Sequence, residues 1–235
     1  MIAAVMNVAN EMDIVGICLR HHIANGIDRV YIYDASTDGT RDIYTDLISE
    51  GVDLRVHDDT GQYWEQAALT NALVDMARAD GAAWIVPVDA DEFIYSPDGR
   101  TIAEALADCP HDVLYMQRWL HTDWDHRHID SERLPKVLFR GIEGAHVDFG
   151  NHQCSLLGGT YGVLEMRELQ FRSFEHFCTK NRRRIASLSP QSRAAGYGTH
   201  QTHLEGYSDE QMRAEWEAMM ALLATFDPIP LRVPQ

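Results

Sequence analysis

The sequence lacks the features that mark secreted, disulfide-bonded and membrane-spanning proteins. Its four cysteines show no C-x-x-C pair and lie within apolar patterns, which argues against a disulfide framework or a zinc site and favours a reducing compartment. No run approaches the roughly 18 uninterrupted apolar residues of a membrane span. The apolar start, residues 1–6, carries no basic leader, so we interpret it as a strand and not as a signal peptide. We therefore expect the protein in the cytoplasm.

Positive charge is also scarce in one half of the chain. Residues 1–115 hold 6 Lys and Arg against 21 Asp and Glu, whereas residues 116–235 hold 14 against 15. Nucleic-acid binders usually present a basic face, so nucleic acid is not an expected partner. An acidic half that can hold a cation, beside a half that can hold an anion, suits a metal–diphosphate ligand. The alternative is an acidic surface that serves solubility, with one solvated basic helix.

Strand and helix patterns alternate over the first hundred residues, which predicts an α/β protein with a mostly parallel sheet flanked by helices. The predicted strands are 2–7, 29–33, 52–57, 83–88 and 113–117, and the predicted helices are 11–25, 40–49, 64–79 and 102–107. Residues 119–165 look irregular apart from a strand at 135–139, and helices return at 174–188 and 208–223. Without an internal repeat or a linker, we expect a single domain with an irregular second half and C-terminal helices.

Two Asp-x-Asp triplets occur, and spacing alone does not distinguish them. With 22 Asp in 235 residues, chance alone produces about two such triplets. Asp89 and Asp91 directly follow the apolar run 84–88, so we expect their carboxylates at the carboxyl end of a buried parallel strand, where α/β proteins bind ligands. Carboxylates this close repel each other unless a cation, a positive side chain or protonation relieves them, and Mg²⁺ or Mn²⁺ accepts one or two of them together with phosphate oxygens. The other triplet, Asp123-Trp-Asp125, lies in the irregular segment.

A turn with similar chemistry follows the strand 29–33. Its sequence, Asp34-Ala-Ser-Thr-Asp38-Gly-Thr40, can accept hydrogen bonds from a nucleoside or can simply cap the next helix. Together with Asn10-Glu-Met-Asp13 and Val88-Asp-Ala-Asp-Glu-Phe93, this turn resembles the motifs of family 2 glycosyltransferases and their relatives of GT-A fold. The three motifs occur in the family's order over residues 1–95, each at a strand end, and the second half resembles the family more weakly.

This resemblance implies a fold and an activity. We expect a GT-A-type, Rossmann-like domain in which residues 1–115 bind a nucleotide-sugar and residues 116–235 form the acceptor side. The expected reaction is a metal-dependent, inverting transfer of a sugar from a UDP-sugar to a carbohydrate or glycolipid acceptor. The implied nucleoside pocket and its supporting turn comprise Asn10, Glu11, Asp34, Ser36, Asp38 and Asp59.

The resemblance also implies how a diphosphate is held. Asp89 would face the ribose and the metal, and Asp91 would coordinate the metal between the two phosphates. Lys136, Arg172 and Lys180 would help to neutralise the leaving diphosphate.

The chain departs from the family at the third metal ligand. Relatives often place a His four residues before the basic-Ser pair that corresponds to residues 172–173, and here that position is Glu168. Glutamate can still bind Mn²⁺ or Mg²⁺, and His152 and His176 are the alternatives.

The resemblance leaves the general base open. Asp123 is the first candidate because it lies on the segment where such enzymes begin the acceptor site, and Asp125 and Asp148 are the alternatives.

Two other functions remain as hypotheses. A nucleotidyl- or phosphoryl-transferring enzyme would need a Gly-rich, basic phosphate loop after the first strand, and residues 8–12, Val-Ala-Asn-Glu-Met, have neither feature. A non-catalytic nucleotide-sugar- or carbohydrate-binding module is favoured by the departure at Glu168. We interpret the basic run 182–184 as a solvated helix face; an acceptor contact, or a peripheral contact at the inner face of the membrane, is the alternative.

Overall fold

The computed structural model describes residues 1–59, 65–121, 123–128, 134–170, 172–194, 196, 202–223 and 226–227. The strands in these ranges are β1 (Ile2–Val8), β2 (Arg29–Asp34), β3 (Leu54–Asp58), β4 (Trp84–Pro87), β5 (Glu92–Tyr95), β6 (Val113–Leu120), β7 (Arg127–His128), β8 (Lys136–Arg140), β9 (Thr160–Glu168) and β10 (Phe226–Asp227). The helices are α1 (Val15–Ala24), α2 (Thr40–Ser49), α3 (Gln66–Ala79), α4 (Ile102–Ala107), α5 (Phe174–Ser187), α6 (Pro190–Ala194) and α8 (Asp209–Leu222). None of them has the length and apolar character that crossing a bilayer requires.

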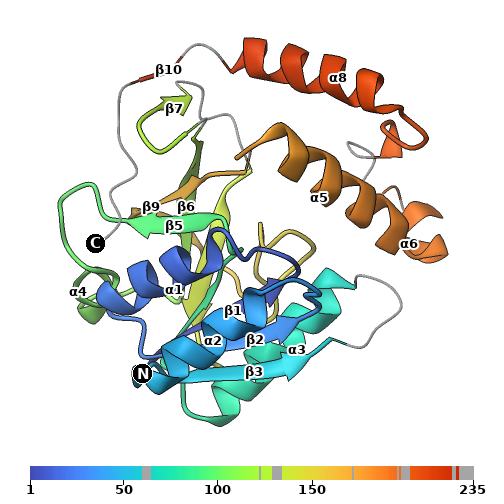
Figure 1. Ribbon diagram of the computed structural model, residues 1–235. Coiled ribbons are helices and arrows are strands. Elements are labelled where there is room, and N and C mark those ends of the chain that lie inside the picture. The colour runs from blue at the N-terminus through green and yellow to red at the C-terminus, as the bar shows by residue number, and fades with distance from the viewer. Residues whose placement is uncertain are drawn as a thin grey trace.

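One eight-stranded sheet takes strands from both halves of the chain, in the order β3-β2-β1-β4-β8-β6-β9-β5 (Figure 1). The first four strands of this order are parallel to one another. Beyond β4 the pairing is mixed: β8 runs antiparallel to β4 and β6, β9 runs parallel to β6, and β5 runs antiparallel to β9. The predicted α/β class is confirmed, and its parallel part comes from the first hundred residues.

Two apolar layers cover the parallel strands because side chains alternate between the faces of β1. Ala4 and Met6 pack with residues of α1 and α2 on one face. Ala3 and Val5 pack with residues of α3 on the other face. This double burial explains the near-continuous apolar composition of β1 and β4.

A third, smaller cluster holds the C-terminal helices together. Phe177, Cys178 and Ile185 of α5 pack with Leu204 and with Met212 of α8. In Figure 1 these two helices lie together, apart from α1, α2 and α3. One side of α5 therefore packs against α8, and another side is available to face the edge of the sheet.

Several helix ends follow the sequence signals, and some element bounds do not. Gly26 and Gly51 end α1 and α2 at φ 95° and 92°, and Ser208 caps α8 in a capping box. The first helix begins at Val15 and not at residue 11, because residues 11–14 form a turn after Asn10, whose φ is 58°.

The prediction that residues 119–165 contain one strand is wrong. β6 continues to Leu120 through an irregular register, and β9 begins at Thr160. β9 starts with exposed residues at 161–163, and its alternation of apolar and polar positions begins only at Leu164. β5 was not predicted either, because its first residue, Glu92, belongs to the acidic motif at residues 88–93.

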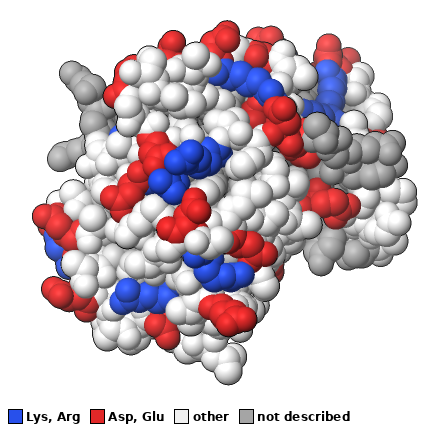
Figure 2. Space-filling view, turned by 90° about the horizontal axis from the view of Figure 1, so that it is seen from below, with Lys and Arg blue, Asp and Glu red and all other residues white. Residues whose placement is uncertain are grey.

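The few basic side chains of residues 1–115 are all engaged in ion pairs. The six residues are Arg20, Arg29, Arg41, Arg55, Arg78 and Arg100. On the face in Figure 2, basic side chains lie next to acidic ones and form no continuous basic area. Arg41 balances the buried Asp34, and each of the other five pairs with an acidic residue away from the tripeptide at residues 89–91, so a cation that balances that tripeptide must come from the second half of the chain.

Gly141 provides a test of the contact between the parallel and the mixed parts of the sheet. A Cβ at this position would lie 1.9 Å from the carbonyl oxygen of Ala82, and the N–H of Gly141 donates to the carbonyl of Ala83 at 3.1 Å. We expect Gly141→Ala to lower the free energy of unfolding by about 1–3 kcal/mol, because the backbones must separate. Ile142→Ala, at a 43% exposed neighbour, should change it by less than about 0.5 kcal/mol. Urea unfolding measures both, and equal midpoints would contradict this account.

Candidate functional site

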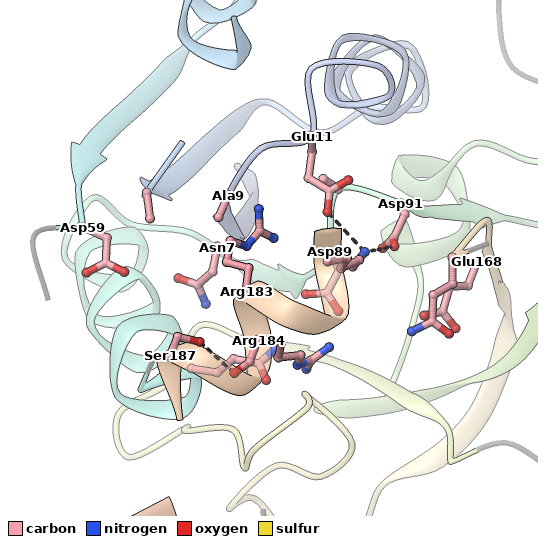
Figure 3. A pocket seen from close by; sticks show the side chains of 15 residues that line it. Asn7, Ala9, Glu11, Asp59, Asp89, Asp91, Glu168, Arg183, Arg184 and Ser187 are labelled. Atoms are coloured by element: carbon pink, nitrogen blue, oxygen red, sulfur yellow. Dashed lines mark hydrogen bonds and ion pairs between the residues drawn. The ribbon is translucent and has the colours of Figure 1, made fainter. Parts of the chain in front are cut away.

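The carboxyl ends of the parallel strands meet at one cavity of about 270 Å³ (Figure 3). The chain passes from β1 outward to β2 and β3 and then returns to β4 on the other side of β1, so the edge between β1 and β4 is a topological switch point. The residues that line the cavity are Asn7, Ala9, Glu11, Ala35, Asp59, Gln66, Asp89, Ala90, Asp91, Glu168, Gln170, Lys180, Arg183, Arg184 and Ser187.

Asp89 and Glu92 share one buried ammonium group. Lys136 of β8, which is 2% exposed, has its Nζ 3.0 Å from Oδ2 of Asp89 and 2.8 Å from Oε1 of Glu92. Burial alone would raise the pKa of Asp89, but Lys136 holds it below its usual value. Burial raises the pKa of Glu92 to about 8, although Lys136 opposes this. Lys136 lies beneath the tripeptide and does not line the cavity.

Lys180 of α5 bridges the loop after β1 and the turn after β4. Its Nζ lies 3.2 Å from Oε1 of Glu11 and 2.5 Å from Oδ2 of Asp91. Arg172 pairs with the second oxygen of Glu11, and its Nη1 is 3.9 Å from Asp91. Burial alone would raise the pKa of Glu11, but Lys180, His176 and Arg172 together hold it well below its usual range. The acidic edge is thus tied to α5 by charge.

Glu168 reaches the cavity from a strand far along the chain. Because β5 and β9 are antiparallel, Glu92 lies opposite Glu168, and the N–H of Leu169 donates to the carbonyl of Asp91 at 2.8 Å. Burial and the neighbouring carboxylate of Asp91 raise the pKa of Glu168, although Arg118, 3.6 Å away, opposes this. The residue predicted as a third metal ligand therefore lies beside the tripeptide.

Two of the residues predicted for the nucleoside pocket, Glu11 and Asp59, line the cavity. Asn10 instead connects two loops. Its N–H donates to Oγ of Ser36 at 2.8 Å, and its Oδ1 accepts from the N–H of Thr37 at 2.7 Å. These bonds hold the turn after β2 against the loop after β1.

Asp34 and Asp38 support that turn from inside. Asp34 is fully buried, with Oδ1 2.6 Å from Oγ of Ser36 and Oδ2 2.6 Å from Nε of Arg41. Asp38 accepts from the N–H of Thr40 at 2.9 Å, at the start of α2. Neither lines the cavity, and a direct contact of either residue with a nucleoside stays a prediction.

None of the three predicted general bases lines the cavity. Asp123 accepts from the N–H groups of Asp125 and His126, at 2.8 and 2.9 Å, and so shapes its own loop. Asp148 accepts from the N–H of His152 at 2.9 Å. Asp125 is exposed at the surface of the same loop as Asp123.

The structure brings neither predicted histidine to Asp91. His152 has its Nδ1 2.7 Å from the carbonyl oxygen of Pro135, and burial lowers its pKa. His176 lies on the side of Glu11, with Nε2 3.5 Å from that carboxylate.

Within the described ranges, no three His, Cys, Asp or Glu side chains lie close enough to hold a metal by themselves. Asp89, Asp91 and Glu168 nevertheless line one cavity with hard oxygen donors. Mg²⁺ or Mn²⁺ commonly takes one or two carboxylates and completes its coordination with phosphate oxygens. The donor set therefore fits a divalent ion shared with a phosphate ligand.

The contribution of α5 was only partly predicted. Lys180, Arg183, Arg184 and Ser187 all line the cavity, and their spacing places them on one helix face. The interpretation of residues 182–184 as a solvated face holds for Arg182, which pairs with Asp209, and is wrong for the other two. The helical spacing from Lys180 is the feature of the sequence that points to them. The polar side chains Asn7, Gln66 and Gln170 also line the cavity, and no motif indicated them.

Comparison with known proteins decides the family. A family model described as Glycosyl transferase family 2 matches residues 4–157, more than half of the chain. The chain belongs to this family. The resemblance seen in three strand-end motifs is thereby confirmed. No curated protein matches the sequence.

Solved structures of family 2-like enzymes agree with the fold. S. aureus TarS aligns with a TM-score of 0.52 at 13% identity, over 89% of this chain and 46% of that chain. TarS in complex with UDP gives 0.45 at 18% identity, over 60% and 47%. Glucosyl-3-phosphoglycerate synthase from Mycobacterium tuberculosis, in complex with Mn²⁺, UDP and glucosyl-3-phosphoglycerate, gives 0.35 at 16% identity, over 52% and 44%. The chain spans about half the length of these proteins. The likeness to TarS at a TM-score of 0.52 confirms the GT-A fold.

Lys136 gives the stability test of this family 2 site. We expect Lys136→Met to lower the free energy of unfolding by about 3–5 kcal/mol, because Asp89 and Glu92 lose their buried cation. Arg140→Met on the same strand is the matched control. Arg140 lies over the ring of Trp84 and forms no ion pair with the described residues, so the loss there should be about 1 kcal/mol. Denaturant unfolding at neutral pH compares the two variants, and equal losses would argue against the shared ammonium group.

Proposed function

We propose that the protein transfers a sugar from a nucleoside diphosphate donor, a UDP-sugar, to a hydroxyl group of a carbohydrate or glycolipid. The observation that carries the proposal is one cavity at the switch point between β1 and β4, with carboxylates on one side and the basic side chains of α5 on the other. Membership of glycosyl transferase family 2 supports the same chemistry. The enzyme would work in the cytoplasm, with a peripheral contact at the inner face of the membrane where the acceptor is a glycolipid.

In this proposal the transfer depends on Mg²⁺ or Mn²⁺. Asp91 would hold the ion with Asp89 or Glu168 as the second carboxylate, and phosphate oxygens of the donor would complete the set. The bound ion would act as a Lewis acid that neutralises charge on the leaving diphosphate. Lys180, 2.5 Å from Asp91, contributes a fixed positive charge at the same carboxylate.

The transfer would invert the sugar's configuration, as the family resemblance implies. A general base would then take the acceptor's proton on the face of the sugar opposite the diphosphate. Segment 123–125 follows β6, whose last residue, Leu120, lies opposite Glu168, so this segment begins beside the acidic side of the cavity. Because Asp123 is bound by its own loop, the exposed Asp125 is the base we favour, ahead of Asp148.

Thermal unfolding with UDP, GDP and CDP, each with and without Mn²⁺, tests the donor assignment. At a hundred times its Kd, the correct diphosphate should raise Tm by roughly 5–11 °C in the presence of Mn²⁺. Asp91→Asn should remove most of the Mn²⁺-dependent part of this shift. Asp98→Asn, at an exposed turn where Asp98 pairs with Arg100, should leave it unchanged. A full shift in Asp91→Asn would refute the metal assignment, and no shift with any diphosphate would refute the donor class.

Slow hydrolysis of the bound donor tests catalysis without a known acceptor. We expect Asp125→Asn to lower the hydrolysis rate by about a hundredfold or more while the Tm shift with the diphosphate persists, because a general base acts on rate and not on donor binding. The same substitution at Asp98 is the control. An unchanged rate would remove Asp125 from the mechanism, and no hydrolysis by the wild type would favour a binding module.

A further inference from the structure

The helix α5 presents two different faces, and its charges divide between them. Lys180, Arg183, Arg184 and Ser187 follow one another at helical spacing and all line the cavity. Phe177, Cys178 and Ile185 face the cluster shared with α8. In Figure 3 the labelled Arg183, Arg184 and Ser187 come from this one helix, across the cavity from Glu11 and Asp91. The cavity therefore has a basic side that the strand-end motifs do not supply.

Arg183 and Arg184 differ from their neighbours because no acidic side chain among the described residues forms an ion pair with either of them. Lys180 pairs with Glu11 and Asp91, and Arg182 pairs with Asp209 at 2.6 Å. Among the described residues, neither Arg183 nor Arg184 forms an ion pair, although both side chains are half-buried. Burial lowers the pKa of Arg183, as expected for a positive charge partly withdrawn from water. In a chain of net charge −16, two such arginines facing one cavity indicate a place for an anion.

We propose that Arg183 and Arg184 form an anion subsite that binds the diphosphate of the donor. The inference rests on the proposed function and adds residues to it. Arg183 and Arg184 lie one helical turn, about 5.4 Å, beyond Lys180, which is already bound to Asp91. Arg184 also contributes to the low pKa of Asp89, so it lies near the tripeptide. A guanidinium group binds phosphate oxygens with two parallel hydrogen bonds, and such charge-assisted bonds are strong.

The subsite is distinct from the metal, because the arginines are present whether or not a cation is bound. Isothermal titration with UDP in EDTA isolates their contribution. We expect Arg183→Gln and Arg184→Gln each to weaken UDP binding about tenfold or more, while uridine binding is unchanged. Arg182→Gln, in the same run of residues but paired with Asp209 outside the cavity, should stay within about twofold of the wild type. Arg184→Lys keeps the charge without the two-pronged geometry and should bind UDP with intermediate affinity.

The outcomes separate this inference from the proposed function. If UDP, GDP or CDP binds and the variants at positions 183 and 184 bind it as tightly as Arg182→Gln, the subsite is refuted and the donor assignment stands. If no nucleoside diphosphate binds even when Mn²⁺ replaces EDTA, the donor assignment fails, and titration with inorganic pyrophosphate tests the subsite alone. Pyrophosphate binding that is lost only in the variants at 183 and 184 supports the anion subsite; no binding, or equal binding in all variants, refutes it. Thermal unfolding of each variant confirms that it is folded.

Discussion

A buried ammonium group beneath the acidic tripeptide sets the position of the rest of the site. Lys136 comes from β8, which runs antiparallel to β4, and its Nζ meets two carboxyl groups of the turn that follows β4. A buried charge that loses its partner costs several kcal/mol, so β4 and β8 cannot slide past one another without a large penalty. The parallel and mixed parts of the sheet are joined at this register. This register also sets the positions of the turn at Asp91 and of strand β5. It sets the position of Glu168 as well, because β5 pairs with β9.

The uneven charge of the chain explains why the site is shared between its two halves. The first half brings the carboxylates to the strand ends, and its six arginines are all engaged in ion pairs. Arg41 balances the buried Asp34, and the cations beside the other buried carboxylates of the site come from the second half, as Lys136, Arg172 and Lys180. Even so, the ammonium group of Lys136 contacts two carboxyl groups, and burial raises the pKa of Glu92 to about 8. Neither half could bury its charged groups here without the other.

Local patterns predicted the part of the site that depends on local structure. Asp89 and Asp91 follow a strand covered on both faces, so their place at the carboxyl edge of the sheet followed from periodicity, whereas the place of Glu11 at the same site was implied by the family resemblance. Glu168 was named by its position in a motif, but its contact with the tripeptide depends on the pairing of β5 with β9, and neither strand was predicted. The partners of Lys136 and Lys180 depend on packing between distant segments of the chain. The sequence predicted a phosphate as the partner of both ammonium groups, and in the structure both contact carboxylates.

The helix α5 is held by apolar packing on one side and by charge on the other. Its apolar residues join α8 in a cluster separate from those around the sheet, whereas Lys180 and the preceding Arg172 reach Glu11 and Asp91 at the sheet edge. Among the described residues, ion pairs connect α5 to the sheet edge, whereas apolar contacts connect it to α8. The position of α5 relative to the sheet therefore depends on charge, and Lys180 brings its positive charge to the carboxylate at which the proposed cation would bind.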